Sequence, residues 1–168
     1  MPAGFVYLRD VDPTIIQDMR YAGSNNFVGR PLKGYDAAEC VVKREVGALL
    51  KSIQEELALQ NLSLKMFDCY RPTRAVADMV AWSRNGRETP AQKRYNPAFK
   101  KADLFRLGYI ATHSGHSTGA ALDLCEWNNA LLGTAENTAG GQQAGGMIGA
   151  RGCITNVSAT MPREFVVA

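Results

Sequence analysis

The chain has 168 residues, of which 46% are hydrophobic and 21% charged, so it is long enough for one globular domain with a substantial core. Its 19 basic and 16 acidic residues leave a formal charge of +3, an excess too small to indicate nucleic-acid binding without a clustered basic face. No stretch could span a membrane and residues 1–9 show no signal peptide, so we expect a cytoplasmic protein, or a periplasmic one if an export signal was removed.

The N-terminal part begins with short elements and continues as a loop. An apolar run at residues 5–8 predicts a strand, and the turn residues at 10–13 lead into a brief predicted helix at 14–19. Residues 18–35 are rich in Gly, Asn and aromatic side chains and have no hydrophobic period, which predicts an ordered loop. Composition alone would make this loop a surface connection.

Helical periodicity starts after residue 36. Apolar residues at spacings of three and four predict one long amphipathic helix whose stripe packs in the core: Val42, Val46, Leu49, Leu50, Ile53 and Leu57. Residues 64–67 predict a strand, which Pro72 ends before a further predicted helix at 73–82. Arg71 therefore lies at a strand end, where its guanidinium can reach across a pocket instead of pointing into water.

Basic residues are concentrated between residues 84 and 106, interleaved with Tyr95 and Phe99. This composition is the one feature that would suggest an RNA-binding module. Gly86, Pro90 and Pro97 interrupt the segment and favour a broken loop, a lid or an insertion, instead of a helical basic face. We therefore expect no nucleic-acid partner.

Residues 112–123 hold both histidines of the chain and place a carboxylate shortly after the second one. Gly119 allows a tight turn, and the alternation at residues 121–124 predicts a short strand that points Asp123 to one face. An imidazole nitrogen and a carboxylate oxygen suit Zn²⁺ when one position stays open for water. The segment therefore predicts a zinc site with His116 and Asp123 as ligands. His113 is expected to be exposed, or to pack against the ligands without binding the metal.

Ser114, His116, Gly119, Ala121 and Asp123 together resemble the Ser-x-His-x-x-Gly-x-Ala-x-Asp motif of the zinc D,D-peptidase and D-alanyl-D-alanine dipeptidase family. The resemblance implies a compact α+β domain with helices packed on a small antiparallel sheet. It also implies zinc-dependent hydrolysis of a small D-alanyl-D-alanine type dipeptide, in cell-wall precursor metabolism or glycopeptide resistance. Zinc in such a site polarises the scissile carbonyl and lowers the pKa of its bound water toward ~7.

Further matches to the same family lie upstream. The segment that contains Tyr21 and Tyr35 resembles the Arg-Tyr-Ala…Asn-Phe-x-Gly…Gly-Tyr segment along the family's substrate cleft, which makes both tyrosines candidate pocket residues. Asp-x-Tyr-Arg-Pro resembles the element that carries the arginine stabilising the tetrahedral intermediate, a role that falls to Arg71. Ser114 is expected to hold the substrate or, alternatively, to serve as a turn hydroxyl.

The resemblance is continuous to Leu124 and stops there. The family ends in Glu-x-x-His, which supplies the general base and the third zinc ligand, but no histidine follows His116 in this chain. Glu164 stands in the place of the base, and Val167 stands where the histidine should be. We therefore expect a peptidase-like core at 1–124 and a divergent, flexible, Gly- and Ala-rich tail at 125–168, a change that a frameshift or truncation near codon 125 would produce.

The tail leaves the third ligand open. Candidates within it, besides Glu164, are Cys125, Glu126, Glu136 and Cys153. All four cysteines, which include Cys40 and Cys69, lack a Cys-x-x-Cys pair and are expected to be mostly buried thiols. Because a two-ligand zinc site is normally weak, the competing interpretation is a non-catalytic family member that has lost its base and third ligand.

Overall fold

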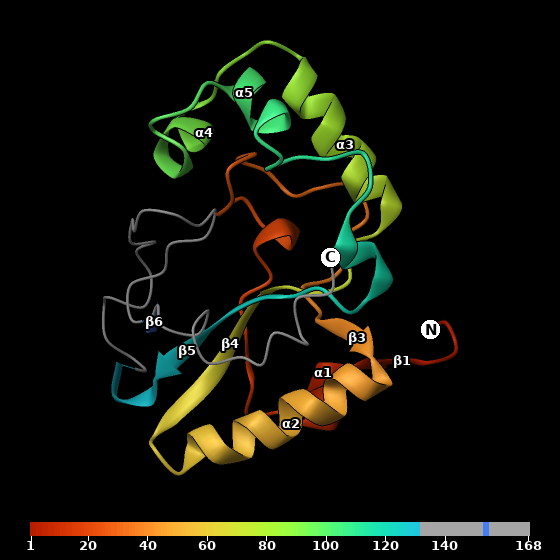
Figure 1. Cartoon of the computed structure of the whole chain (residues 1–168), viewed down its shortest axis with the longest axis vertical. Helices are drawn as coiled ribbons and strands as arrows, with labels where there is room; N and C mark the ends of the chain where they lie inside the picture. The colour runs from red at the N-terminus through yellow and green to blue at the C-terminus, as the bar shows by residue number, and fades with distance from the viewer. Residues whose placement is uncertain (132–152, 155–168) are drawn as a thin grey trace.

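Helices and two small sheets make up residues 1–131 and 153–154, which the computed structural model describes (Figure 1). The strands are β1 (Phe5–Tyr7), β2 (Ile16–Gln17), β3 (Val41–Lys43), β4 (Leu62–Asp68), β5 (Asp123–Asn128) and β6 (Cys153–Ile154). The helices are α1 (Leu8–Val11), α2 (Arg44–Ala58), α3 (Thr73–Arg84), α4 (Pro90–Tyr95) and α5 (Lys101–Arg106), with short 3-10 turns η1 (Arg20–Ala22), η2 (Gly115–Thr118) and η3 (Asn129–Leu131). The predicted α+β class is confirmed.

The sheets bring two acidic residues to one place. β1 pairs antiparallel with β3, while the other sheet has the order β2-β4-β5-β6, with β2 parallel to β4 and the remaining pairs antiparallel. The β4–β5 register runs from Leu62 opposite Asn128 to Asp68 opposite Asp123, with an irregularity just before Asp68. Both carboxylates therefore stand at the same end of the central strand pair.

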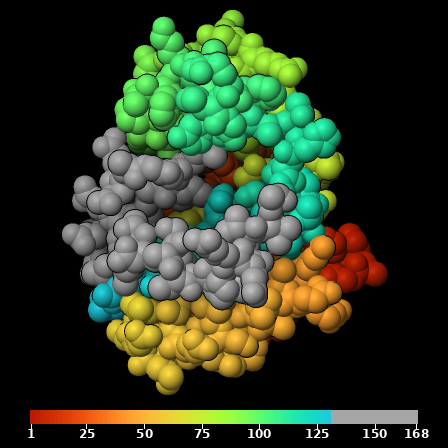
Figure 2. Space-filling view, in the orientation of Figure 1, coloured from red at the N-terminus to blue at the C-terminus, as the bar shows by residue number. Residues whose placement is uncertain are grey.

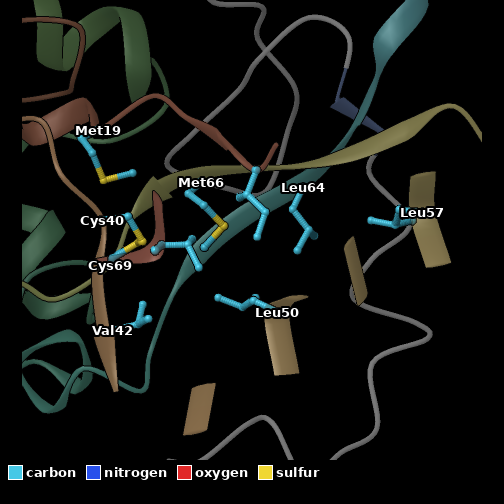
Figure 3. Close-up of a cluster of buried hydrophobic side chains, with 10 residues drawn as sticks. Met19, Cys40, Val42, Leu50, Leu57, Leu64, Met66 and Cys69 are labelled. Atoms are coloured by element: carbon cyan, nitrogen blue, oxygen red, sulfur yellow. A yellow bond between two sulfur atoms is a disulfide. The ribbon is translucent and has the colours of Figure 1, made fainter. Parts of the chain in front are cut away.

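The first core cluster lies between α2 and β4. Its members include Leu50 and Leu57 from α2 and Leu64 and Met66 from β4, and each of them is buried (Figure 3). The predicted long amphipathic helix is confirmed from residue 44 onward. Its expected first apolar residue, Val42, belongs instead to β3, because pairing with β1 extends the chain there.

A second core cluster fixes the loop at residues 18–35. Its members come from this loop, from α3 and from α5, and include Phe27, Trp82 and Leu104. The buried carboxylate of Asp78 on α3 accepts hydrogen bonds from both terminal nitrogens of Arg30, at 2.6 and 3.0 Å, and from the backbone of the same loop. The predicted ordered loop is therefore confirmed, apart from the single turn η1.

Two predicted elements are wrong. The helix expected at residues 14–19 is replaced by a turn and β2, because Ile16 and Gln17 pair with the centre of β4. The broken loop expected at 84–106 contains α4 and α5. Pro90 does not interrupt α4 but starts it, since proline is suited to the first helical position, and Thr89 caps the helix by accepting a hydrogen bond from Gln92.

Of the basic side chains in this segment, Lys101 is buried and the others are exposed. Lys101 is 2% exposed, lies over the Trp82 ring and donates to the Arg87 carbonyl, while Arg94 donates to Asn25. No described helix has the length and apolar character needed to cross a membrane.

The expectation of buried thiols is wrong for at least three of the four cysteines. Cys40 and Cys69 are both buried and form a disulfide, and Cys125 is also disulfide-bonded. Cys40 precedes β3 and Cys69 follows β4, and the backbone bond from Tyr70 N to Val41 O holds these two segments side by side. Spacing along the sequence could not show this contact.

Candidate metal centre

His116 and Asp123 are brought together by the turn η2 and the first residue of β5. Ser114 caps η2 by accepting a hydrogen bond from the backbone N–H of His116 at 3.3 Å. Gly119 ends the turn with a φ of +76°, a left-handed conformation that favours glycine. The backbone N–H of Arg71 donates to the His116 carbonyl at 3.1 Å, which ties η2 to the end of β4.

The two ring nitrogens of His116 have different partners. Nδ1 lies 3.1 Å from the Cys69 carbonyl oxygen, and because a carbonyl only accepts, Nδ1 carries the proton. Nε2 is then the nitrogen with a lone pair, and it lies 3.6 Å from Oδ1 of Asp123. A carbonyl that orients one histidine nitrogen while the other binds metal is a common arrangement in metal sites.

The spacing fits a shared ion. Ligand bonds of about 2.0–2.1 Å in a tetrahedral site place two ligand atoms roughly 3.3 Å apart, close to the 3.6 Å observed between Nε2 and Oδ1. Asp68, His116 and Asp123 form a group whose ligand atoms all lie within 4.8 Å of one another. Burial raises the pKa of the Asp123 carboxyl above its ordinary value, although His116 opposes the rise. A cation between these residues would favour the ionised carboxylate.

Asp68 is completely buried and already has four donors. Its Oδ2 accepts from Nε and Nη2 of Arg71 at 2.9 and 2.6 Å. Its Oδ1 accepts from the hydroxyl of Tyr35 at 2.5 Å and from the Cys69 backbone at 3.0 Å. A carboxylate offers about four lone-pair sites, so the hydrogen bonds of Asp68 are saturated without a metal.

Arg71 is held between this carboxylate and two tyrosine rings. Its guanidinium carbon lies 5.0 Å from the centroid of the Tyr21 ring, which in turn lies 5.9 Å from that of Tyr35. Burial alone would lower the pKa of the Arg71 guanidinium, but Asp68 and the tyrosines raise it above its ordinary value. Burial also raises the pKa of the Tyr21 and Tyr35 hydroxyls, so all three groups keep their protons at neutral pH.

The structure therefore brings together five of the six residues that the sequence singled out: Tyr21, Tyr35, Arg71, His116 and Asp123. The sixth, Ser114, caps the turn η2. Tyr35 is half-buried, but Tyr21 is only 2% exposed and belongs to the second core cluster. His113 is exposed, and its ring Nδ1 lies 3.2 Å from the hydroxyl of Thr112. Figure 2 shows a hollow in this face of the molecule, bordered on one side by the teal surface of the segment that contains η2.

Asp68 is the residue that sequence reasoning missed. It is the first residue of the Asp-x-Tyr-Arg-Pro element that contains Arg71, so the motif itself marks this carboxylate. A carboxylate three residues before an arginine at a strand end can fold back onto it, as the ion pair of Asp68 and Arg71 shows.

Glu136, Glu164, Val167 and the side chain of Cys153 lie outside the described residues, as does most of the predicted tail. β5 itself continues past the expected core boundary at residue 124 and ends at Asn128.

Comparison with known proteins points to one family. A family model described as D-ala-D-ala dipeptidase matches residues 1–134. The chain is 35% identical to a D-alanyl-D-alanine dipeptidase from Streptomyces coelicolor, 32% identical to one from Enterococcus faecium and 31% identical to one from Enterococcus faecalis, each over 124 residues. These alignments cover 74% of this chain, which spans 61% of the length of the curated relatives it matches.

Proposed function

Because this chain belongs to the D-alanyl-D-alanine dipeptidase family, we propose that it hydrolyses D-alanyl-D-alanine type dipeptides with a zinc ion bound by His116 and Asp123. The observation that carries the proposal is the approach of His116 Nε2 to Asp123 Oδ1 at 3.6 Å, with Nδ1 directed to a carbonyl. A zinc ion held there supplies Lewis acidity and an activated water.

We assign Asp68 to the support of the site and not to the metal. Its two oxygens are occupied by Arg71, Tyr35 and the Cys69 backbone, and leaving any of these donors unpaired in a buried place would cost free energy. Asp68 therefore fixes the position of Arg71 and Tyr35 around the metal centre.

Arg71 is the residue we assign to charge stabilisation. Asp68 takes the Nε and Nη2 donors, and the second terminal nitrogen, Nη1, carries two further N–H donors. Donation from Nη1 to the oxyanion that develops on the scissile carbonyl would stabilise the transition state. Its ion pair with Asp68 holds the guanidinium in place before the substrate arrives.

Tyr35 is assigned to the substrate side of the site, and Ser114 to the turn that carries His116. Tyr35 is half-buried next to Arg71 and can form part of the pocket wall. The buried position of Tyr21 supports a role behind Arg71, where its ring packs against the guanidinium, more than a role in direct substrate contact. Ser114 orients His116 through its cap of η2.

The third ligand and the general base do not come from the tail candidates that the structure describes. Cys125 is disulfide-bonded and so has no thiolate to offer. Glu126 is three residues after Asp123 on the same strand, so the two side chains point to opposite faces. Glu164 keeps the role of candidate base by resemblance.

The disulfides support the periplasmic alternative for the location of the protein. Disulfides form and persist in oxidising compartments and are rare in the cytosol, and at least three cysteines of this chain are bonded. Cell fractionation followed by immunodetection of the protein tests this placement, and recovery in the cytosolic fraction alone would contradict it.

The function is tested by measuring zinc per chain and D-alanine released from D-alanyl-D-alanine in the same preparation. We expect the wild type to bind zinc and release D-alanine, and His116→Ala to lose both. His113→Ala is the matched control, because this exposed histidine lies outside the metal group and should keep zinc and activity.

Equal loss of zinc in the two histidine variants would contradict the ligand assignment. Bound zinc without release of D-alanine would favour the alternative, a family member without catalytic activity.

A further inference from the structure

The carbonyl that orients His116 belongs to a disulfide-bonded residue. Cys69 O lies 3.1 Å from His116 Nδ1, and Cys69 Sγ is bonded to Cys40. Cys69 also follows Asp68 directly, and its backbone N–H donates to Asp68 Oδ1 at 3.0 Å. The same residue thus contacts the imidazole of the proposed metal ligand and the carboxylate that holds Arg71.

The other half of the disulfide is fixed in a different part of the framework. The Cys40 carbonyl accepts a hydrogen bond from the Leu8 backbone at 2.9 Å, where α1 begins. The Cys40 backbone N–H donates to the side chain of Gln17 on β2, also at 2.9 Å. Cys40 and Cys69 lie together at one side of the first core cluster (Figure 3) and are 0% and 1% exposed.

We propose that the Cys40–Cys69 disulfide is a positioning element of the metal centre. It anchors the Cys69 carbonyl to the segment that carries α1 and β2. This carbonyl is the nearer of two acceptors at His116 Nδ1, at 3.1 Å against 3.4 Å for Asp68 Oδ2, and it sets the tautomer and the orientation of His116. Groups that orient a metal-binding histidine in this way affect metal affinity about 10- to 100-fold when they are lost. The inference rests on the proposed metal site at His116 and Asp123.

The proposal makes the site sensitive to redox conditions. A dithiol reductant would transfer two electrons and two protons to the pair, which breaks the S–S bond, leaves two thiols and converts the reductant to its own disulfide. Tyr70 N would still donate to Val41 O, so the strand end would stay in place approximately. The expected consequence is weaker metal binding and a less fixed imidazole, and not the loss of the fold.

The test removes the disulfide by substituting Cys40, the cysteine that does not contact His116 or Asp68. Cys40→Ala removes the disulfide and leaves Cys69 and its carbonyl in the chain. Leu50→Ala is the matched control, because Leu50 is buried in the same core cluster and its truncation destabilises the protein without touching the bond. Cys40→Ala/Cys69→Ala is the second variant, which leaves no unpaired buried thiol if the single variant folds poorly.

Two quantities are measured for each protein. The zinc affinity is obtained by competition with a chelating indicator. The tautomer of His116 is read from ¹⁵N NMR of the metal-free protein, with His113→Ala as the background that leaves a single histidine to assign. The second measurement needs neither bound metal nor activity, and general destabilisation alone would not change it.

We expect the disulfide-free variants to bind zinc at least ~10-fold more weakly than the wild type and to show both tautomers of His116, while Leu50→Ala keeps wild-type affinity and the Nδ1-protonated form. Wild-type affinity and a single tautomer without the disulfide would overturn the inference, as would equal losses in Leu50→Ala. If the wild type binds no zinc, the proposed function fails, and the tautomer comparison still decides whether the disulfide positions His116.

Discussion

One buried carboxylate, Asp68, connects the groups that surround the metal centre. It accepts two hydrogen bonds from Arg71 and one from Tyr35, and its Oδ2 lies 3.4 Å from His116 Nδ1. Because Asp68 is completely buried, water cannot replace a lost partner. Substitutions around Asp68 should therefore affect both the stability of the fold and the position of Arg71.

The first prediction concerns Arg71. Arg71→Lys keeps the positive charge but loses the planar group that donates to Asp68 through two nitrogens, so we expect kcat to fall by roughly 10²- to 10³-fold while zinc content stays unchanged. Steady-state kinetics and metal analysis measure the two effects. Arg74→Lys is the control, since Arg74 is exposed and pairs with exposed Asp36. Wild-type kcat in Arg71→Lys would remove this residue from the mechanism.

The second prediction concerns Tyr35. Tyr35→Phe removes one donor from buried Asp68, so the free energy of unfolding should fall by about 1–3 kcal/mol and kcat should fall as Arg71 loses support. Urea unfolding and kinetics check this. Tyr95→Phe makes the same chemical change at an exposed hydrogen bond to Asn25 and should have little effect. Similar losses of unfolding free energy in the two variants would show that the hydrogen bond from Tyr35 to buried Asp68 contributes no more to stability than an exposed one.

At the residue scale, the sequence could predict contacts between residues that lie close together in one motif. His116 and Asp123 are close in sequence and a turn brings them together, so their spacing was informative. The disulfide between Cys40 and Cys69 joins positions 29 residues apart, and no local pattern marks it. The burial of Tyr21 also depends on packing from α3, which the loop sequence does not contain.

At the scale of elements, α3 fixes the loop at residues 18–35 through Asp78. The hydrogen bonds from Arg30 lower the pKa of the Asp78 carboxyl in the folded state, although burial opposes the shift. A carboxyl with a lowered pKa in the fold stabilises the protein at pH values above its unfolded pKa, near 3.9, and this contribution is lost as pH falls through the folded value.

The third prediction follows from the lowered pKa of the Asp78 carboxyl. Asp78→Asn should lower the free energy of unfolding by about 1–3 kcal/mol at pH 7, and the difference from wild type should shrink below pH ~4. Urea unfolding across this pH range measures it. Asp103→Asn is the control, because Asp103 pairs with an exposed arginine and should contribute little. A difference that stays constant to pH ~2 would contradict the electrostatic explanation.

Periodicity predicted α2, which packs through a regular apolar stripe. It failed where a partner distant in sequence decides the conformation: β2 is a strand because it pairs with β4, and Val42 is extended because it pairs with Val6. The interpretation of Pro90 as an interruption is wrong, because Pro90 is the first residue of α4, a position that suits proline.

At the scale of the whole molecule, the disulfide joins the two sheets. Cys40 adjoins β3 in one sheet and Cys69 follows β4 in the other. The fourth prediction is that Cys40→Ala/Cys69→Ala lowers the free energy of unfolding by about 3–4 kcal/mol, since the bond closes a loop with a sequence separation of 29. Urea unfolding without reductant measures this. A loss below about 1 kcal/mol would show that the unfolded chain is not constrained as this loop length implies.

The family and the α+β class could be predicted from residues 1–124 because the motifs lie there. The third ligand and the base could not, since the sequence after Leu124 leaves the family pattern and residues 132–152 and 155–168 lie outside the described part. The chain spans 61% of the length of its curated relatives. The activity of those relatives is therefore proposed for this chain.

The cysteine pair also has an evolutionary consequence. A chain with only one of the two cysteines would carry a buried thiol and lose the link between the sheets, so neither residue alone provides the benefit of the bond. Residues in direct contact tend to change together across a family. In an alignment of related dipeptidases, cysteines at the positions of Cys40 and Cys69 should therefore appear and disappear as a pair, which identifies from sequence the relatives that share this link.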